Sequence, residues 1–104
     1  MSEAPALINL QISFRNIEAT DALKTYANEK INHCIQKFLH KNSDAHIILK
    51  VEKSRQIAEV TVHSAGYDFI VTEESGDMYA SIDKLIDTLT HQLRKHKERL
   101  TSHH

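Results

Sequence analysis

The sequence is poor in the residues that cross-link or break a chain. It has one Cys, one Pro, two Gly and no Trp among 104 residues. A single cysteine cannot form an internal disulfide, and no stretch has the length and apolar character of a secretory signal or a membrane-spanning helix. We therefore expect a cytoplasmic protein, and its 40% of hydrophobic residues is enough to bury one modest core.

The scarcity of Gly and Pro, with no internal repeat and no low-complexity tract, leaves little room for a linker. We therefore expect a single domain over residues 7–100. The remaining residues, 1–6 and 101–104, show no periodic pattern and are expected to form flexible ends.

Periodic patterns divide this domain into six elements. Apolar and polar residues alternate in four segments, which predicts half-buried strands at 8–14, 45–51, 58–62 and 67–71. Apolar residues recur at helical spacing in two others, which predicts helices over 20–40 and 77–100. Thr20 and Asp77 are the expected N-caps. Tight reversals are expected at Ser54-Arg55 and at Ala65-Gly66, where Gly66 can adopt a positive φ.

The order β-α-β-β-β-α favours an α+β fold in which the last three strands form adjacent antiparallel hairpins. Each helix has one apolar stripe to bury, and the sheet has one apolar face. Both helices packed on that face give a two-layer sandwich with a four-stranded sheet. The opposite sheet face is then expected to be exposed and polar.

The formal net charge of −1 hides a segregation of charges along the chain. Residues 56–83 contain six acids and neither Lys nor Arg, whereas residues 88–104 contain four Lys and Arg against one acid. Such segregation can create a local positive field that the total conceals.

Each predicted helix has a basic edge. At roughly 100° per residue, each helix carries three basic residues within an arc of about 40°. The members are Lys30, Lys37 and Lys41 on the first helix and Lys84, His91 and Lys95, with Arg99 beside them, on the second. Helices that lie side by side could join these edges into one groove or ridge that binds RNA or another polyanion. Two alternatives remain, a solvated face whose cations offset the helix dipoles and a docking surface for an acidic protein partner.

The segment ESGDMYASIDKLIDTLTHQLRKHKERL, residues 74–100, resembles the signature end of the ribosome hibernation promoting factor family. The likeness extends through NIEATDALKTYANEKI and VEKSRQIAEVTVHSAGYDFIVTEESGDMYASID, and so covers nearly the whole chain. It implies a fold similar to double-stranded-RNA-binding domains. It also implies binding to small-subunit ribosomal RNA in the channel used by messenger and transfer RNA, which silences translation by steric occlusion.

The resemblance also implies which residues contact RNA. Six positions match basic residues of the family pattern: Lys30, Lys84, Arg94, Lys95, Lys97 and Arg99. Lys37 and His91 join them by helical geometry. The chain departs from the family pattern at Cys34 and Ile35, at Lys37, where an aromatic residue is common, and at Ala65-Gly66.

The chain looks like the short form of the family. In short-form systems a separate ribosome modulation factor helps to pair ribosomes into inactive dimers, and whether that occurs here stays open. We expect a monomer away from the ribosome, with no cofactor, no membrane partner and no catalytic activity.

Other chemistries find little support in the residues. His46 and His63 can share the outer sheet face, but no carboxylate or thiol accompanies them at a metal-ligand spacing, so no metal site is expected. Cys34 lies on an apolar stripe, which favours a core residue over a nucleophile. Tyr26 and Tyr79 could stack on bases, although their places beside the apolar stripes favour the rim of the core.

Overall fold

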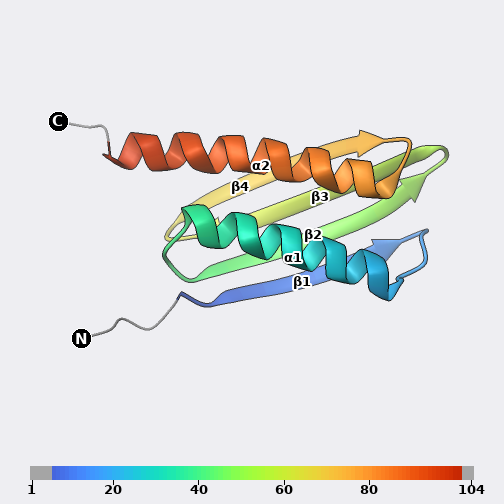
Figure 1. Cartoon of the computed structure of the whole chain (residues 1–104), viewed down its shortest axis with the longest axis horizontal. Helices are drawn as coiled ribbons and strands as arrows, with labels where there is room; N and C mark the ends of the chain where they lie inside the picture. Colours follow the sequence, from blue (N-terminus) through green and yellow to red (C-terminus); the bar gives the residue numbers. More distant parts are fainter. Residues whose placement is uncertain (1–5, 102–104) are drawn as a thin grey trace.

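The computed structural model describes residues 6–101, and its elements follow the predicted order. They are β1 (Ile8–Arg15), α1 (Asp21–Phe38), β2 (Ser43–Glu52), β3 (Arg55–Ser64), β4 (Tyr67–Ser75) and α2 (Met78–Thr101). Both helices lie on one face of the sheet, which confirms the predicted two-layer α+β sandwich (Figure 1). The predicted flexible ends lie outside the described residues except for Ala6 and for Thr101, the last residue of α2.

The four strands lie in the order β1-β2-β3-β4. Strands β2, β3 and β4 form two antiparallel hairpins, as predicted from the sequence. Strand β1 pairs with β2 in parallel, with Ile8 opposite Ser43 and Arg15 opposite Lys50. Parallel neighbours need a crossover connection, and α1 provides it by crossing the sheet between them.

The two hairpin turns depend on residues with a positive φ. Ala65 and Gly66, with φ of 51° and 84°, connect β3 to β4, and two successive positive φ angles suit the twist of a two-residue hairpin. The prediction for Gly66 is therefore confirmed. The reversal before β3 falls at Lys53-Ser54 and not at Ser54-Arg55, because Lys53 takes the left-handed conformation (φ 57°) and Arg55 already pairs with Glu52.

Both predicted helix N-caps are confirmed. The Thr20 hydroxyl accepts a hydrogen bond from the Leu23 N–H at 3.2 Å, and the Asp77 carboxylate accepts one from the Ala80 N–H at 3.1 Å. Helix α1 ends at Phe38, two residues before the predicted boundary, because Leu39 is extended. Lys41 therefore lies beyond the helix, and its predicted place on the helical edge is wrong.

The core lies between the helices and the inner face of the sheet. Large side chains from both layers are fully buried there, among them Ile31, Ile35, Ile47, Val60, Leu85 and Leu89. The outer face is mostly polar, but Ile48, Ile57 and Ile70 belong to it, and of these three only Ile57 is buried. Ile57 belongs to that face by strand alternation, yet only 3% of it is exposed. Lys50 on β2 and Glu74 on β4 lie directly opposite Ile57, and their side chains cover it.

Candidate functional site

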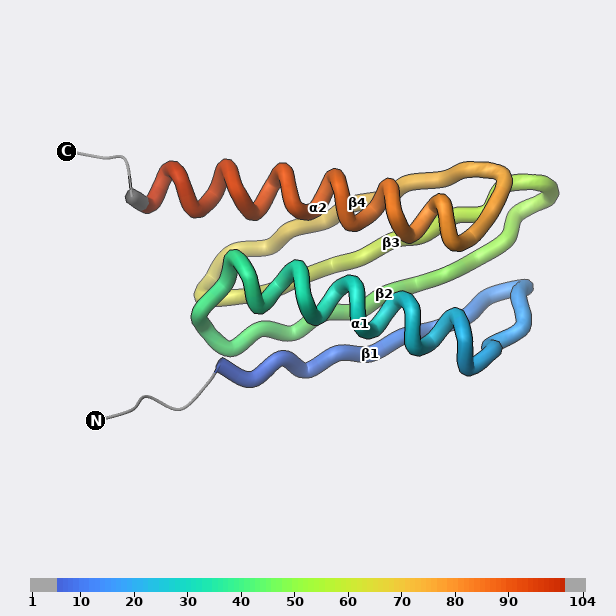
Figure 2. Tube along the Cα trace, in the orientation of Figure 1, coloured from blue at the N-terminus to red at the C-terminus, as the bar shows by residue number. Residues whose placement is uncertain are grey.

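The exposed surface of the helical layer carries all eight candidate residues. Helices α1 and α2 lie side by side and run in the same direction (Figure 2). The eight predicted side chains are all exposed: Lys30, Lys37, Lys84, His91, Arg94, Lys95, Lys97 and Arg99. The helical layer therefore presents its cations to solvent, as the sequence predicted.

One group of these cations borders a cavity of about 450 Å³ between the two helices. Its walls include Lys30, Lys37 and Phe38 of α1 and Ile86 and Thr90 of α2, together with one acid, Glu29. Because both helices contribute, this cavity is an interhelical groove. His33 of α1, a neighbour of the basic edge in the sequence, lines the groove as well.

Aromatic rings hold the cations beside the interhelical groove. The Lys30 ammonium lies 5.3 Å from the centre of the Tyr26 ring, and the Lys37 ammonium lies 5.5 Å from the centre of the Phe38 ring. The Arg94 guanidinium of α2 lies 5.8 Å from that same Phe38 ring. Cation–π contacts attract the charge without neutralising it. These cations are therefore positioned and still able to bind an anion.

A second group lies on the opposite side of α2, facing β4. The Lys84 ammonium donates to the Glu74 backbone carbonyl at 3.2 Å. Lys95 and Arg99 line a cavity of about 380 Å³ that also includes Tyr67 and Phe69 of β4. His91, seven residues after Lys84, lies on nearly the same side of the helix, whereas Lys97, three after Arg94, lies toward α1.

The prediction of one shared groove is therefore wrong in part, because the cations of α2 lie on both of its sides. Helical spacing separates Arg94 and Lys97 from Lys84, His91 and Lys95, and the rotation of α2 about its axis decides what each group faces. Thr88 donates to the Glu73 carboxylate of β4 at 2.6 Å, while Thr90 and Cys34 of α1 share a hydrogen bond at 3.2 Å. These contacts turn the residues near Thr88 toward the sheet edge and those near Thr90 toward α1.

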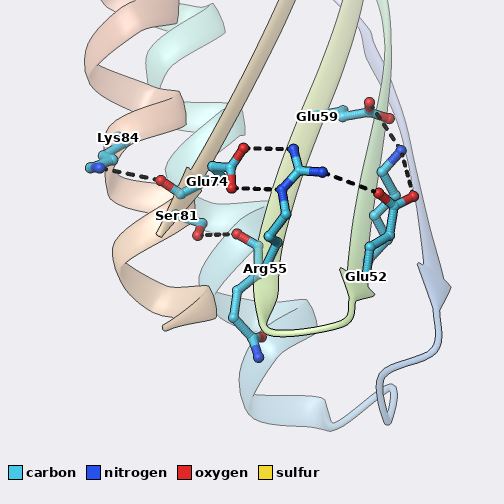
Figure 3. A network of polar contacts seen from close by, with 8 residues as sticks. Glu52, Arg55, Glu59, Glu74, Ser81 and Lys84 are labelled. Atoms are coloured by element: carbon cyan, nitrogen blue, oxygen red, sulfur yellow. Dashed lines mark hydrogen bonds and ion pairs between the residues drawn. The ribbon is translucent and has the colours of Figure 1, made fainter. Parts of the chain in front are cut away.

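Three acids of the outer sheet face, Glu52, Glu59 and Glu74, form ion pairs with cations of the sheet itself. Arg55 donates to both oxygens of Glu74 at 2.7 and 2.8 Å, and Lys50 lies 3.3 Å from Glu59. Figure 3 shows this network, in which Arg55 also approaches Glu52 at 3.6 Å. The hydrogen bonds from Arg55 lower the pKa of Glu74, and those to Glu74 raise the pKa of Arg55. Opposite charges therefore offset one another on the sheet face.

Cys34 and Tyr26 have structural partners. Cys34 is 4% exposed, and burial raises the pKa of its thiol, so the thiol form is favoured over the nucleophilic thiolate. The Tyr26 hydroxyl donates to Asp83, and the ring meets Tyr79 edge-on at 5.0 Å. The hydrogen bond to Asp83 raises the pKa of Tyr26. Tyr26 packs against the core as predicted, while Tyr79 is 38% exposed.

The two histidines of the outer face each have a nearby partner. His46 shares a hydrogen bond with Ser13 at 2.8 Å, and His63 with Asp68 at 2.6 Å. Within residues 6–101, no three side chains among His, Cys, Asp and Glu are gathered so that they could hold a metal ion. Over the same residues, neither helix combines the length and the apolar character needed to cross a membrane.

Sequence reasoning missed the aromatic side of the cavity beside β4. His96 of α2 meets Tyr67 at 4.4 Å between ring centres and Phe69 at 5.2 Å, both edge-on. Gln92, His96 and Leu100 follow one another at four-residue spacing on α2, which could have indicated a second side facing the sheet edge. Their partners on β4 depend on the packing of α2 beside that strand.

Comparison with known proteins gives a consistent result over nearly the whole chain. The family model described as sigma 54 modulation protein / S30EA ribosomal protein matches residues 10–101. A ribosome hibernation promoting factor of Klebsiella oxytoca is 38% identical over 96 residues, which covers 92% of this chain and all of the relative. The protein of the same description from Escherichia coli K12 is 35% identical with the same coverage.

Solved structures share the fold. The N-terminal domain of Protein Y from Thermus thermophilus superposes with a TM-score of 0.77 and 30% identity, covering 84% of this chain and 97% of that domain. A ribosomal subunit interface protein from Coxiella burnetii gives the same TM-score at 26% identity, covering 86% and 97% of the two chains. The similarity therefore extends to the arrangement of the helices on the sheet.

Proposed function

Because the chain belongs to the sigma 54 modulation protein / S30EA ribosomal protein family, we propose that it is a ribosome hibernation factor. Its relatives named ribosome hibernation promoting factor align along their full length with this chain. Eight exposed basic residues of α1 and α2 bind ribosomal RNA of the small subunit. They are the eight candidates: Lys30, Lys37, Lys84, His91, Arg94, Lys95, Lys97 and Arg99.

The proposed mechanism is steric occlusion without a chemical step. The domain lies in the channel that messenger and transfer RNA use, and its presence blocks both. Lys and Arg contacts to phosphates position a rigid protein against folded RNA without reading its sequence. Two helices fixed on one sheet face suit this role, because their cations keep a constant spacing.

One observation carries this proposal beyond the family membership. The cations beside the interhelical groove lie over neutral aromatic rings, while Glu59 and Glu74 of the sheet form ion pairs with Lys50 and Arg55. A protein of net charge −1 thereby keeps a positive surface that can bind phosphates.

We also propose the setting in which this protein acts. Residues 7–100 form the ribosome-binding domain, which is a monomer away from the ribosome and works in the cytoplasm during slow growth or stress. Its partner is the small ribosomal subunit. Pairing of inactive ribosomes with help from a ribosome modulation factor is a further outcome that the same binding permits.

Sedimentation with purified small ribosomal subunits tests the proposal. The protein should cosediment, and the triple change Lys84→Glu, Lys95→Glu and Arg99→Glu should abolish cosedimentation while the circular dichroism spectrum stays unchanged. A triple reversal at three exposed cations outside both helices gives the same change in net charge: Arg15→Glu, Lys41→Glu and Lys53→Glu. That control should still cosediment.

The opposite results would reject the assignment. Retained binding by the first triple variant would show that another surface contacts the ribosome. Failure of the unchanged protein to cosediment would favour an acidic protein partner for the same cations.

A further inference from the structure

The cavity between α2 and β4 has a composition that phosphate binding alone does not explain. In Figure 1 the last turns of α2 project past the turn that joins β3 to β4. The cavity lies at this end of the helix, with Tyr67 and Phe69 on one side and residues 92–100 of α2 on the other. Its volume of about 380 Å³ is in the range of small-molecule sites.

The apolar part of this cavity is formed by rings and by Leu100. His96 lies edge-on to both Tyr67 and Phe69, with ring centres 4.4 and 5.2 Å apart. These contacts fix the Tyr67 ring from one side, yet 47% of Tyr67 and 52% of Leu100 remain exposed. A fixed and half-exposed aromatic ring can stack with a flat ligand without losing much side-chain entropy.

The polar part of the cavity carries two cations. Lys95 and Arg99 lie one helical turn apart, and like charges at that spacing cost the helix a few tenths of a kcal/mol. The acid that lines the cavity, Asp68, has its carboxylate hydrogen-bonded to His63 at 2.6 Å. Gln92 adds an amide that can both donate and accept. The cavity therefore combines an aromatic wall, an amide and two cations, against one acid that is already hydrogen-bonded.

We propose that this cavity binds a single nucleotide, with its base against Tyr67 and its phosphate against Lys95 and Arg99. A nucleotide joins a flat aromatic base to an anion, and both halves of the cavity match it. The nucleotide comes either from an unstacked position of the bound RNA or from free nucleotide. The first source rests on the proposed function, and the second does not.

Titration of ¹⁵N-labelled protein with 5′-AMP and 5′-UMP tests this proposal by NMR. The amide signals of residues 67–69 and 92–100 should shift together. Ribose 5-phosphate and adenosine, each with half of the ligand, should bind roughly tenfold more weakly, because each loses one set of contacts. Equal shifts with ribose 5-phosphate would reduce the cavity to an anion site and overturn the proposal.

Variants of Tyr67 separate stacking from other effects. Tyr67→Ala should weaken binding of 5′-AMP or 5′-UMP by roughly tenfold, the scale of one lost base stack. Tyr67→Phe keeps the aromatic ring and should retain the affinity of the unchanged protein. Ile70→Ala serves as a matched control, because Ile70 lies on the same strand, is 68% exposed and belongs to the opposite face of the sheet. It should change nothing.

Cosedimentation of these variants with small subunits identifies the source of the nucleotide. Weaker sedimentation of Tyr67→Ala, but not of Tyr67→Phe, assigns the site to ribosomal RNA, even if free 5′-AMP fails to bind. Shifts with 5′-AMP and unchanged sedimentation assign it to free nucleotide.

The proposal is overturned if Tyr67→Ala changes neither nucleotide binding nor cosedimentation. Binding of an acidic peptide with an aromatic residue in place of a nucleotide would overturn it as well. If the unchanged protein fails to cosediment, the proposed function fails, and the 5′-AMP titration alone still decides the cavity.

Discussion

On the outer face of the sheet Arg55 holds Glu74 through two hydrogen bonds, whereas on the helical layer Lys30, Lys37 and Arg94 lie over aromatic rings. The ion pairs of the sheet cancel over a few ångströms and produce little field at a distance. A neutral aromatic ring does not cancel the charge of the cation that lies over it. Two faces of one small domain can therefore use the same residue types differently, paired with each other on the sheet face and left available for the proposed binding on the helical face.

Salt should separate the two faces most strongly. Binding to small subunits should weaken by roughly a thousandfold between 50 and 200 mM salt, the scale for a protein with several phosphate contacts. The thermal stability of the free protein should change little over that range, because exposed ion pairs contribute modestly. Cosedimentation and thermal unfolding in the same buffers measure both. Binding that ignores salt would indicate an apolar interface.

Removal of the apolar residue under the ion pairs should affect stability alone. Ile57→Ala leaves a gap below Lys50 and Glu74 and should lower the free energy of unfolding by roughly 2–4 kcal/mol in urea denaturation. Binding of the folded protein should persist. Ile70→Ala, on the same face but exposed, should cost less than about 0.5 kcal/mol. Equal effects would mean that the ion pairs do not cover Ile57.

Substitution of one cation on each face should show the same difference with a smaller effect on binding. Arg94→Ala should weaken binding about fivefold to tenfold and reduce the slope of log affinity against log salt by about one, as loss of one phosphate contact does. Arg55→Ala should leave both quantities unchanged and lower Tm slightly. If Arg55→Ala weakened binding as much as Arg94→Ala, the sheet face would belong to the interface.

The smallest expected effect concerns pH. Because Arg55 lowers the pKa of Glu74, their pair stabilises the fold above the pKa that Glu74 has when unfolded. This stabilisation is lost as pH falls through the lowered pKa of the folded state. Tm of the protein should therefore exceed that of Glu74→Gln at neutral pH, and the difference should shrink as the pH falls below the range in which an unfolded Glu titrates. A difference that persists in acid would contradict the ionic origin of the contact.

The sequence predicted the elements, the helix caps and the two-layer arrangement, because each depends on residues close together in the chain. Alternation placed Ala58, Val60 and Val62 inside, and the Thr20 and Asp77 caps need partners only three residues away. The parallel pairing of β1 with β2 could not be read in this way, because it depends on contacts between residues 35 positions apart.

The sequence named the candidate residues, whose role in RNA binding stays a prediction, but it did not give their layout. Helical periodicity fixes which cations share a side of α2, but the rotation of α2 on the sheet decides what that side faces. The contacts of Thr88 with Glu73 and of Thr90 with Cys34 set that rotation. The burial of Ile57 on the outer face likewise could not be read from alternation, because its neighbours Lys50 and Glu74 lie on the two adjacent strands.

The left-handed Ala65 between β3 and β4 offers a practical handle on this molecule. The left-handed conformation of Ala65 costs most L-residues about 1 kcal/mol or more, and it costs Asn or Gly less. Ala65→Asn should thus raise the free energy of unfolding and give a more stable parent protein. In that background, drastic charge reversals on the helices could be studied with a margin against unfolding, so that a lost affinity is not confused with a lost fold.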